Sequence, residues 1–224
     1  MIEKKVAVSW SGGKDCCLAL YRMLQENKNV ACLVSMVSAK DARNHAHGIR
    51  LEILKLQAEA LGLPLVLVDS AGDYESSLIK ALTQLKEHQG IEEIVFGSLY
   101  AEEDRKWNEE VAYKAGMEPL FPVWITQEES ADLLEEFISL GFSAVVCRAS
   151  EKLFDKSWAG KLLDRSFSKE IQQHNVCPMG ELGEYHTFIL DGPIFQKSVS
   201  IMESGVVLNS GLWSLDVKRC ELGD

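Results

Sequence analysis

The sequence lacks any run of about 18 apolar residues, the length that a helix needs to cross a bilayer. Residues 1–5 lead straight into a β-prone stretch, without the apolar core or the cleavage site of a secretory signal. We therefore predict a cytoplasmic protein with no membrane partner.

Cysteine pairs spaced for metal binding are also missing. The six cysteines lie in scattered hydrophobic segments, and none belongs to a Cys-x-x-Cys motif. This distribution favours reduced, mostly buried thiols and gives no support to a zinc site or an iron–sulfur cluster.

The sequence has fewer positively charged than negatively charged residues. The chain has 34 acidic and 23 basic residues, which give it a net charge of −11. Because nucleic-acid binding draws on a positive surface, this balance weighs against tRNA or DNA as the main partner. A small or protein-borne substrate fits the composition better.

What the sequence does contain is a regular alternation of apolar stretches. Hydrophobic residues make up 46% of the 224 positions, which is enough for a buried core. Up to residue 116, four β-prone runs alternate with four helical patterns, which predicts an α/β fold with a doubly wound parallel sheet. A stretch at 119–124 breaks the alternation. We therefore predict a nucleotide domain over residues 1–124 and a smaller α+β domain over residues 125–224.

Three local features are also expected from the sequence. Residues 41–48 form a polar loop after the second strand. Residues 126–129, Thr-Gln-Glu-Glu, have the form of a capping box at the start of a helix. A further helix is predicted around residues 160–174.

The first helix begins at a short loop, residues 11–15, with the sequence Ser-Gly-Gly-Lys-Asp. A strand precedes this loop, and the apolar residues after it recur at helical spacing. Such a helix N-terminus offers unpaired backbone N–H groups and the positive end of a helix dipole, both of which favour phosphate. The predicted nucleotide-binding residues of the loop are Ser11, Gly12, Gly13, Lys14 and Asp15.

The side chains of this loop suit phosphate chemistry. Lys14 supplies a mobile positive charge and Ser11 a hydroxyl donor. Asp15 supplies a carboxylate that can hold Mg²⁺ beside the phosphates, so Lys14 and Asp15 are the catalytic candidates here. The spacing fits neither a Walker A loop nor a dinucleotide fingerprint. The structural alternative is a glycine turn that only joins the strand to the helix.

Two further segments are expected at the same site, because ligands of parallel sheets lie at the carboxyl ends of the strands. They follow the second and the fourth strand, and Gly97 is expected to let the backbone approach the nucleotide. The residues that these segments add to the predicted site are Ser35, Gly97, Ser98 and Arg105.

A second polar cluster lies in residues 175–188 of the C-terminal part. It places two carboxylates, an imidazole and a hydroxyl close to two glycines. His186 accepts protons near neutral pH, and Glu184 does so if its environment raises its pKa, so either is a candidate base. The alternative is a glycine turn followed by a half-exposed strand. The substrate-binding residues predicted here are Gly180, Glu181, Gly183, Glu184, His186 and Thr187.

The loop at 11–15 resembles the pyrophosphate-binding PP-loop of the N-type ATP pyrophosphatases. The chain also has Gly-Glu-x-Gly-Glu-Tyr-His-Thr-Phe at 180–188 and Asp-Gly-Pro-Ile-Phe at 191–195. With these paired motifs it is similar to the diphthine-ammonia ligase (diphthamide synthetase) family. The resemblance runs over nearly the whole chain.

The resemblance implies a PP-loop, HUP-like nucleotide domain and a C-terminal substrate-binding domain whose Glu-rich loop faces the ATP site. It implies an ATP-dependent ligase that activates the carboxylate of diphthine, a modified histidine of translation elongation factor 2, as an acyl-adenylate. Ammonia then displaces AMP to form the amide, and pyrophosphate is the other product. The implied partners and cofactors are ATP, Mg²⁺, ammonia and the elongation factor, and a homodimer is a further expectation.

Two positions depart from the family pattern. Cys16, which belongs to the predicted nucleotide site, stands where the family usually has Ser. The sequence Gly97-Ser98-Leu99 replaces the usual Gly-Asp-Ile. We therefore expect one hydroxyl contact to pyrophosphate or to the helix start to be absent, together with any role of that Asp.

Other functions stay open at this point. One is a PP-loop enzyme that modifies tRNA, although such thiolases often carry a cysteine pair and a basic extension that this chain lacks. Another is a bacterial homologue acting on a different carboxylate, since bacteria lack diphthamide. A third is a nucleotide-binding module without turnover, against which the intact Lys14 and Asp15 argue.

Isolated aromatic and imidazole side chains have simpler interpretations. The tryptophans are expected in the core or at the domain interface, and the remaining histidines at the surface or in loops. These residues are Trp10, Trp107, Trp124, Trp158, His45, His47, His88 and His174.

Overall fold

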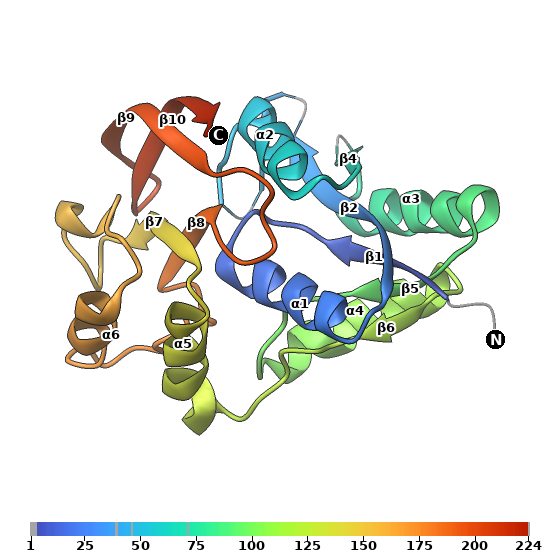
Figure 1. Ribbon diagram of the computed structural model, residues 1–224, viewed down its shortest axis with the longest axis horizontal. Helices are drawn as coiled ribbons and strands as arrows, with labels where there is room; N and C mark the ends of the chain where they lie inside the picture. The colour runs from blue at the N-terminus through green and yellow to red at the C-terminus, as the bar shows by residue number, and fades with distance from the viewer. Residues whose placement is uncertain (1–3, 39, 46, 71, 224) are drawn as a thin grey trace.

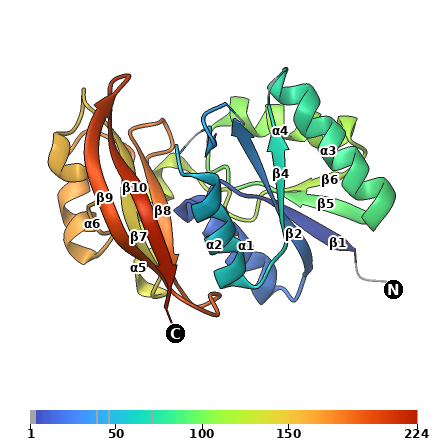
Figure 2. The same ribbon diagram turned by 90° about the horizontal axis from the view of Figure 1, so that it is seen from above.

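The computed structural model describes residues 4–223 except 39, 46 and 71. It contains two β-sheets with a pair of helices between them, as Figures 1 and 2 show. No helix in the described part of the chain is long and apolar enough to cross a membrane.

Parallel strands form most of the first sheet. β1 (Lys5–Ser9) lies between β2 (Asn29–Ser38) and β5 (Ile91–Val95). β4 (Leu65–Asp69) extends the sheet beyond β2, and β6 (Glu118–Leu120) extends it beyond β5. Because all five strands are parallel, their carboxyl ends meet at one edge of the sheet.

Two short strands of this sheet were not predicted. β3 (Arg43–Asn44) lies in the predicted polar loop 41–48 and pairs antiparallel with the end of β2. β6 overlaps the stretch 119–124, which was predicted to be the boundary between the two domains. A strand of three residues that contains a proline carries no periodic pattern, and as an edge strand it tolerates the missing N–H.

Helices cover both faces of the first sheet. α1 (Lys14–Gln25) and α2 (Leu51–Leu61) pack on one face and share a hydrophobic core with the second sheet. α3 (Tyr74–Gln89) and α4 (Glu102–Lys114) pack on the other face, in a separate core. The predicted doubly wound α/β fold is therefore confirmed.

The second sheet is antiparallel and lies beyond α1 and α2. Its strands are β7 (Ser143–Ser150), β8 (Tyr185–Asp191), β9 (Val199–Asn209) and β10 (Leu212–Leu222). They pair in the order β8-β7-β10-β9, so β8 and β9 are the edge strands. This sheet accounts for the predicted smaller α+β part of the chain.

Helices α5 (Ser130–Ser139) and α6 (Arg165–Ile171) pack against each other and against the second sheet. α6 lies on the face away from α1 and α2 (Figure 2), whereas α5 is joined to α1 by an ion pair between Glu136 and Arg22 at 2.8 Å. A 3₁₀ turn, η1 (Gln127–Glu129), leads into α5. It starts with the predicted capping box, in which Thr126 and Glu129 satisfy each other's backbone N–H groups. A second 3₁₀ turn, η2 (Lys156–Trp158), precedes α6.

Helix α6 is shorter than the helix predicted around residues 160–174. Leu162 forms a bridge to Val145 of β7, which keeps the chain extended at that point. The helix starts only after Asp164, whose carboxylate accepts the N–H groups of Ser166 and Phe167. Tertiary pairing with β7 thus overrides a local helical pattern.

The edge strand β8 is joined to the loop that precedes α1. The N–H of Ile189 donates to the carbonyl of Gly12 at 3.0 Å, and the N–H of Lys14 donates to the hydroxyl of Thr187 at 3.0 Å. This seam brings residues that are more than 170 positions apart in the chain into hydrogen-bond contact. It also covers a strand edge that would otherwise present unpaired backbone groups.

Gln57 on α2 forms hydrogen bonds to both sides of this seam. This residue is fully buried, and its Nε2 donates to the carbonyls of Gly12 (3.1 Å) and Ile189 (2.8 Å). Its Oε1 accepts the indole N–H of Trp10 at 3.3 Å. One amide side chain therefore ties together a helix, the β1–α1 loop and the second sheet.

We predict that Gln57→Leu lowers the free energy of unfolding by about 2–5 kcal/mol, because it leaves the carbonyl of Ile189 and the indole N–H of Trp10 buried without partners. Chemical denaturation measures the change. The exposed Gln84 on α3 provides a matched control, and Gln84→Leu should change stability by less than about 0.5 kcal/mol. Equal effects of the two substitutions would contradict the bridging role of Gln57.

Candidate active site

The loop between β1 and α1 is shaped by its two glycines. Gly12 has a φ of +84°, and a Cβ there would lie 2.7 Å from Oε1 of Gln57. A Cβ on Gly13 would overlap the ring of His47 and lie 3.2 Å from the carbonyl oxygen of Thr187. Neither position has room for a side chain, because α2 and the second sheet lie directly against the loop.

One backbone amide of this helix start is already paired. The sequence predicts several unpaired N–H groups facing a phosphate, but the N–H of Lys14 donates to Thr187. The hydroxyl of Thr187 thus caps α1 from another part of the chain, at a helix whose own N-cap residue, Gly13, has no side chain to do so.

Lys14 and Asp15 form an ion pair at the start of α1. Lys14 Nζ lies 3.0 Å from Asp15 Oδ2 and 5.0 Å from the centre of the Tyr185 ring. The mobile lysine expected from the sequence is therefore wrong, since Lys14 is only 2% exposed. Its charge is held in a fixed place by a carboxylate and an aromatic face.

Asp15 keeps one oxygen without a partner. Its Oδ1 is buried and makes no hydrogen bond within the described structure, while Oδ2 meets Lys14. Burial raises the pKa of Asp15, against the lowering influence of Lys14. A divalent cation at Oδ1 would favour the ionised carboxylate, so this residue fits the expected Mg²⁺ ligand.

The rest of such a metal's coordination would have to come from elsewhere. Among the described residues, no group of three or more His, Cys, Asp or Glu side chains is spaced to hold a metal ion. Mg²⁺ often takes one or two carboxylates together with phosphate oxygens and water. Asp15 beside a bound nucleotide matches that pattern.

Cys16 takes part in the loop through its thiol. The Sγ atom donates to the carbonyl of Gly13 at 3.1 Å and lies 3.3 Å from the hydroxyl of Ser11. Burial raises the pKa of Cys16, so the thiol stays protonated and available as a donor. The thiol therefore provides the contact to the helix start that was expected to be absent. All six cysteines are free and buried, as predicted.

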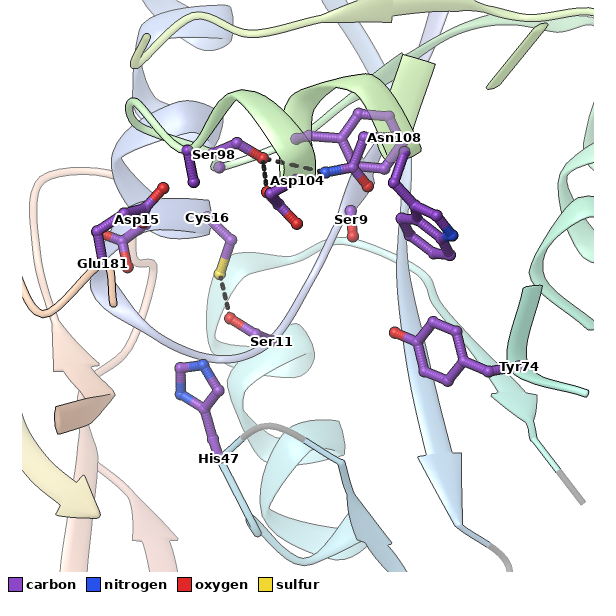
Figure 3. Close-up of a pocket in the computed structure, with 14 residues that line it drawn as sticks. Ser9, Ser11, Asp15, Cys16, His47, Tyr74, Ser98, Asp104, Asn108 and Glu181 are labelled. Carbon is purple, nitrogen blue, oxygen red and sulfur yellow. Dashed lines mark hydrogen bonds between the residues drawn. The ribbon is translucent and has the colours of Figure 1, made fainter. Parts of the chain in front are cut away.

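A cavity of about 390 Å³ opens beside this loop (Figure 3). Its size lies at the lower end of the range for small-molecule sites, roughly 300–1,000 Å³. Predicted site residues that line it are Ser11, Asp15, Cys16, Gly97, Ser98 and Glu181. The lining residues that the sequence analysis did not assign to the site are Ser9, His47, Tyr74, Phe96, Ala101, Asp104, Trp107 and Asn108.

A hydrogen-bonded cluster forms one wall of the cavity. The hydroxyl of Ser98 donates to Asp104, and Asn108 Nδ2 donates to both Ser98 Oγ (3.0 Å) and Asp104 Oδ2 (3.2 Å). Figure 3 shows this cluster facing the loop across the cavity. Asp104 from α4 thus places a carboxylate at the wall where the family's usual Asp after the fourth strand is replaced by Ser98.

Gly97 was predicted to let the nucleotide approach the backbone, but in the structure it allows close contact between two backbone segments. A Cβ at this position would lie 2.8 Å from the backbone nitrogen of Cys16. The glycine therefore lets the chain after β5 pass against the start of α1, and the close approach is to protein backbone. It lines the cavity as well.

Tyr74 stands at the end of the cavity away from Asp15 (Figure 3), and the ring of Trp107 lies beside it. Tyr74 and Trp107 lie 5.9 Å apart at a tilt of 45°, and the indole N–H of Trp107 donates to Glu75. Trp107, which was expected in the core or at the domain interface, packs against the core between the first sheet and helices α3 and α4, and it also lines the cavity. Trp10 and Trp158 are buried in the core as predicted.

The remaining predicted nucleotide-site residues do not line this cavity; they are Gly12, Gly13 and Lys14 of the loop, together with Ser35 and Arg105. Ser35 lines a neighbouring cavity of about 70 Å³, which shares Ser9, Ser11 and Tyr74 with the larger one, and its buried hydroxyl has no partner within the described structure. Arg105 does not line either cavity. Its guanidinium lies against aromatic rings, 5.0 Å from Phe121 and 4.7 Å from Trp124, and pairs with Glu109.

The predicted substrate segment reaches the cavity through Glu181. Glu181 Oε1 accepts the N–H of Leu99 at 3.0 Å, and the side chain faces the same space as Asp15 (Figure 3). Burial raises the pKa of Glu181, and the nearby carboxylates of Asp15 and Asp104 raise it further. This carboxylate is thus held close to the nucleotide loop in an environment that favours its protonated form.

Glu184 has a different environment from the one expected of a base. Its two oxygens accept the N–H groups of Cys177 and Leu182, each at 2.9 Å. The side chain is buried and does not line the cavity. These bonds hold the turn that carries Glu181, so Glu184 shapes the segment while Glu181 faces the cavity.

The rings of His186 and His47 lie next to each other, and His47 lies against Gly13 of the loop. Their ring centres are 4.9 Å apart, and His186 does not line the cavity. Burial, together with the charges of Lys14 and Arg148, lowers the pKa of His186 to about 4. The imidazole is therefore neutral near pH 7, and it is a weaker base than an exposed histidine.

His47 was expected at the surface or in a loop; it does lie in the loop between β3 and α2, but it is not at the surface. The side chain is buried, lines the cavity, and has Nδ1 at 2.7 Å from the carbonyl oxygen of Thr187. No local pattern in the polar loop 41–48 indicates this, because the contact spans 140 positions of the chain.

Comparison with known proteins covers both parts of the chain. A family model described as the diphthamide synthase N-terminal domain matches residues 4–119. A second, described as the diphthamide synthase C-terminal domain, matches residues 129–222.

Individual relatives are similar over most of the chain. The diphthine-ammonia ligases of Bos taurus and Homo sapiens are each 30% identical to it over 237 residues, covering 92% of this chain and 86% of each relative. The diphthine-ammonia ligase of Schizosaccharomyces pombe is 25% identical, and the alignment covers 94% of this chain and 38% of that relative. The chain therefore belongs to the diphthamide synthase family, a family of ligases.

Proposed function

We propose that this chain is an ATP-dependent ligase that adenylates a carboxylate and converts it to an amide with ammonia, releasing AMP and pyrophosphate. By similarity to the named relatives, the carboxylate is that of diphthine on translation elongation factor 2. The observation that carries the proposal is that Ser11 and Asp15 of the Ser-Gly-Gly-Lys-Asp loop border the same cavity as Glu181 of the C-terminal segment.

The proposal assigns the phosphates of ATP to the loop end of the cavity. Ser11 and the start of α1 supply donors and the positive end of a helix dipole, and Lys14 adds a fixed charge. Mg²⁺ held by Asp15 would neutralise phosphate charge when it is bound. The rings of Tyr74 and Trp107 offer a stacking surface for the adenine at the other end.

The proposed reaction has two steps, and each step forms one bond and breaks another. A carboxylate oxygen attacks the α-phosphorus and pyrophosphate leaves. The nitrogen lone pair of ammonia then attacks the carbonyl carbon, the bond to the AMP oxygen breaks, and the nitrogen loses a proton. We assign the acceptance of that proton to Glu181, because its carboxylate faces the cavity and its pKa is raised by burial.

The other predicted residues take supporting roles in this proposal. Thr187 caps α1, Glu184 holds the turn, and Gly180 and Gly183, which both have positive φ, allow that turn to form. The guanidinium of Arg105 packs against the rings of Phe121 and Trp124, which precede α5. The domain boundary at residue 124, the cytoplasmic location and a homodimer stay predictions.

The proposal is tested by incubating the purified chain with ATP, Mg²⁺, ammonium and elongation factor 2 that carries diphthine. The expected products are AMP, pyrophosphate and an elongation factor in which one hydroxyl has been replaced by an amino group, as mass spectrometry detects. Production of ADP and phosphate, or AMP release without amide formation, would contradict it.

Lys14→Met should lower the rate of amide formation by about 100-fold or more, because it removes a buried charge beside the predicted phosphate site while keeping most of the side-chain volume. Steady-state kinetics and chemical denaturation are measured together. Lys106, which is exposed on α4, provides the control, and Lys106→Met should leave the rate within about twofold. A Lys14→Met enzyme with normal turnover would remove Lys14 from the mechanism.

Substitution of Glu181 and Glu184 should separate chemistry from structure. Glu181→Gln should retain acid-dependent exchange of pyrophosphate into ATP and lose about 100-fold or more in amide formation, as expected for a group used after adenylation. Glu184→Gln should lower the free energy of unfolding by about 1–3 kcal/mol, because one of two buried N–H groups loses its acceptor. The reverse pattern would return the base assignment to Glu184.

A further inference from the structure

His47 stands in the wall between the nucleotide loop and the second sheet. Its ring lies directly against Gly13 and lines the cavity together with Ser11 and Cys16. Figure 3 shows the ring turned toward Ser11, on the side of the loop opposite Ser98. The side chain therefore adjoins the place where the loop is expected to hold phosphate groups.

The hydrogen bond to Thr187 fixes which ring nitrogen carries the proton. A carbonyl oxygen only accepts hydrogen bonds, so Nδ1 at 2.7 Å must be the donor. Nε2 of the neutral ring is then an acceptor with a free lone pair, and no partner for it appears among the described residues. A ligand in the cavity has this nitrogen as an available contact.

The groups whose charges act on the ring of His47 favour an anion there, although the cavity is also lined by the carboxylates of Asp15, Asp104 and Glu181. The ionisable groups whose charges act on it are Lys14 of α1, Arg148 of β7 and His186 of β8, and the thiol of Cys147 donates to its backbone carbonyl. Burial, followed by these positive and neutral neighbours, holds the pKa of His47 well below its usual range. In the neutral imidazole, Nε2 is an acceptor and cannot bond to a phosphate oxygen, which is also an acceptor. Uptake of a proton turns Nε2 into a donor and adds a positive charge, so the protonated ring suits phosphate.

We propose that His47 is a phosphate-binding residue that takes up a proton when a polyphosphate enters the cavity, so that Nε2–H donates to a phosphate oxygen. The proposal rests on the proposed function, because it takes the polyphosphate to be that of ATP or the product pyrophosphate. The proton comes from solvent on binding and returns to solvent when pyrophosphate leaves, and no covalent bond of His47 changes.

A dependence of nucleotide binding on pH follows. A bound anion stabilises the imidazolium, so the pKa of His47 is higher in the complex than in the free protein. Binding therefore becomes tighter as the pH falls through the window between the free and bound pKa values, by up to tenfold for each pH unit. Above the bound pKa the affinity no longer depends on His47.

The test uses the full chain labelled with ¹³C at the Cε1 atoms of histidine, titrated by nuclear magnetic resonance with and without magnesium pyrophosphate. The resonance that disappears in His47→Gln identifies His47, and glutamine keeps an N–H for the bond to Thr187. We expect pyrophosphate to raise the proton affinity of His47 at least tenfold. The exposed His88 on α3 is the internal control and should not shift.

Two further ligands identify the anion that His47 contacts. AMP and acetate should each raise the proton affinity of His47 less than pyrophosphate does. An equal shift with acetate would assign the residue to the acid substrate and overturn the proposal, and so would an equal shift with AMP, because the contact would then be to a single phosphate. An unchanged or lowered proton affinity with pyrophosphate bound would also overturn it.

Calorimetry separates this proposal from the proposed function. Wild type should bind pyrophosphate more tightly at pH 6 than His47→Gln does, and the two should converge at pH 8, where the proton on His47 no longer contributes. The ionisation of pyrophosphate itself is common to both proteins and cancels in the comparison. Failure of wild type to bind pyrophosphate would contradict the PP-loop function itself, whereas binding with no difference between the two proteins at either pH would contradict only the role of His47.

Discussion

The hydrogen bonds between β8 and the β1–α1 loop are the contact on which the candidate site depends. The carbonyl of Gly12 accepts from Ile189 and Gln57, and the N–H of Lys14 is capped by Thr187. A glycine loop on its own has many backbone conformations, and these bonds select one of them. The second sheet therefore builds the nucleotide loop as well as contributing residues to the cavity.

This seam explains why both parts of the chain are needed for one site. Glu184 fixes a turn of the C-terminal segment, and that turn places Glu181 in the cavity wall close to Asp15 (Figure 3). At the other side, His47 fills the space that the missing side chain of Gly13 leaves. Burial lowers the pKa of both His47 and His186, and the charges of Lys14 and Arg148 lower it further.

Features that depend on neighbouring residues were predictable from the sequence. The alternating strands and helices, the glycine loop before α1 and the capping box at Thr126 and Glu129 all depend on local spacing, and the structure contains each of them. The paired motifs at residues 11–15 and 180–188 pointed to the family, and the comparisons support it.

Features that depend on long-range contacts were not predictable. His47, Tyr74 and Trp107 line the cavity because of how distant segments pack, and their flanking sequences carry no signal of it. The roles of Glu181 and Glu184 could not be separated either, since both lie among glycines and only the folded turn decides which carboxylate meets backbone N–H groups. The burial of Lys14 also results from the packing of segments that are distant in the chain, so the local sequence does not indicate it.

Amide hydrogen exchange in the protein without nucleotide shows whether the second sheet holds the nucleotide loop in shape before any ligand arrives. The amides of Lys14 and Ile189 should exchange as slowly as those in the middle of β1, because they become exposed only when the hydrogen bonds between β8 and the loop break. Exchange of these two amides as fast as that of the exposed turn between β9 and β10 would contradict it.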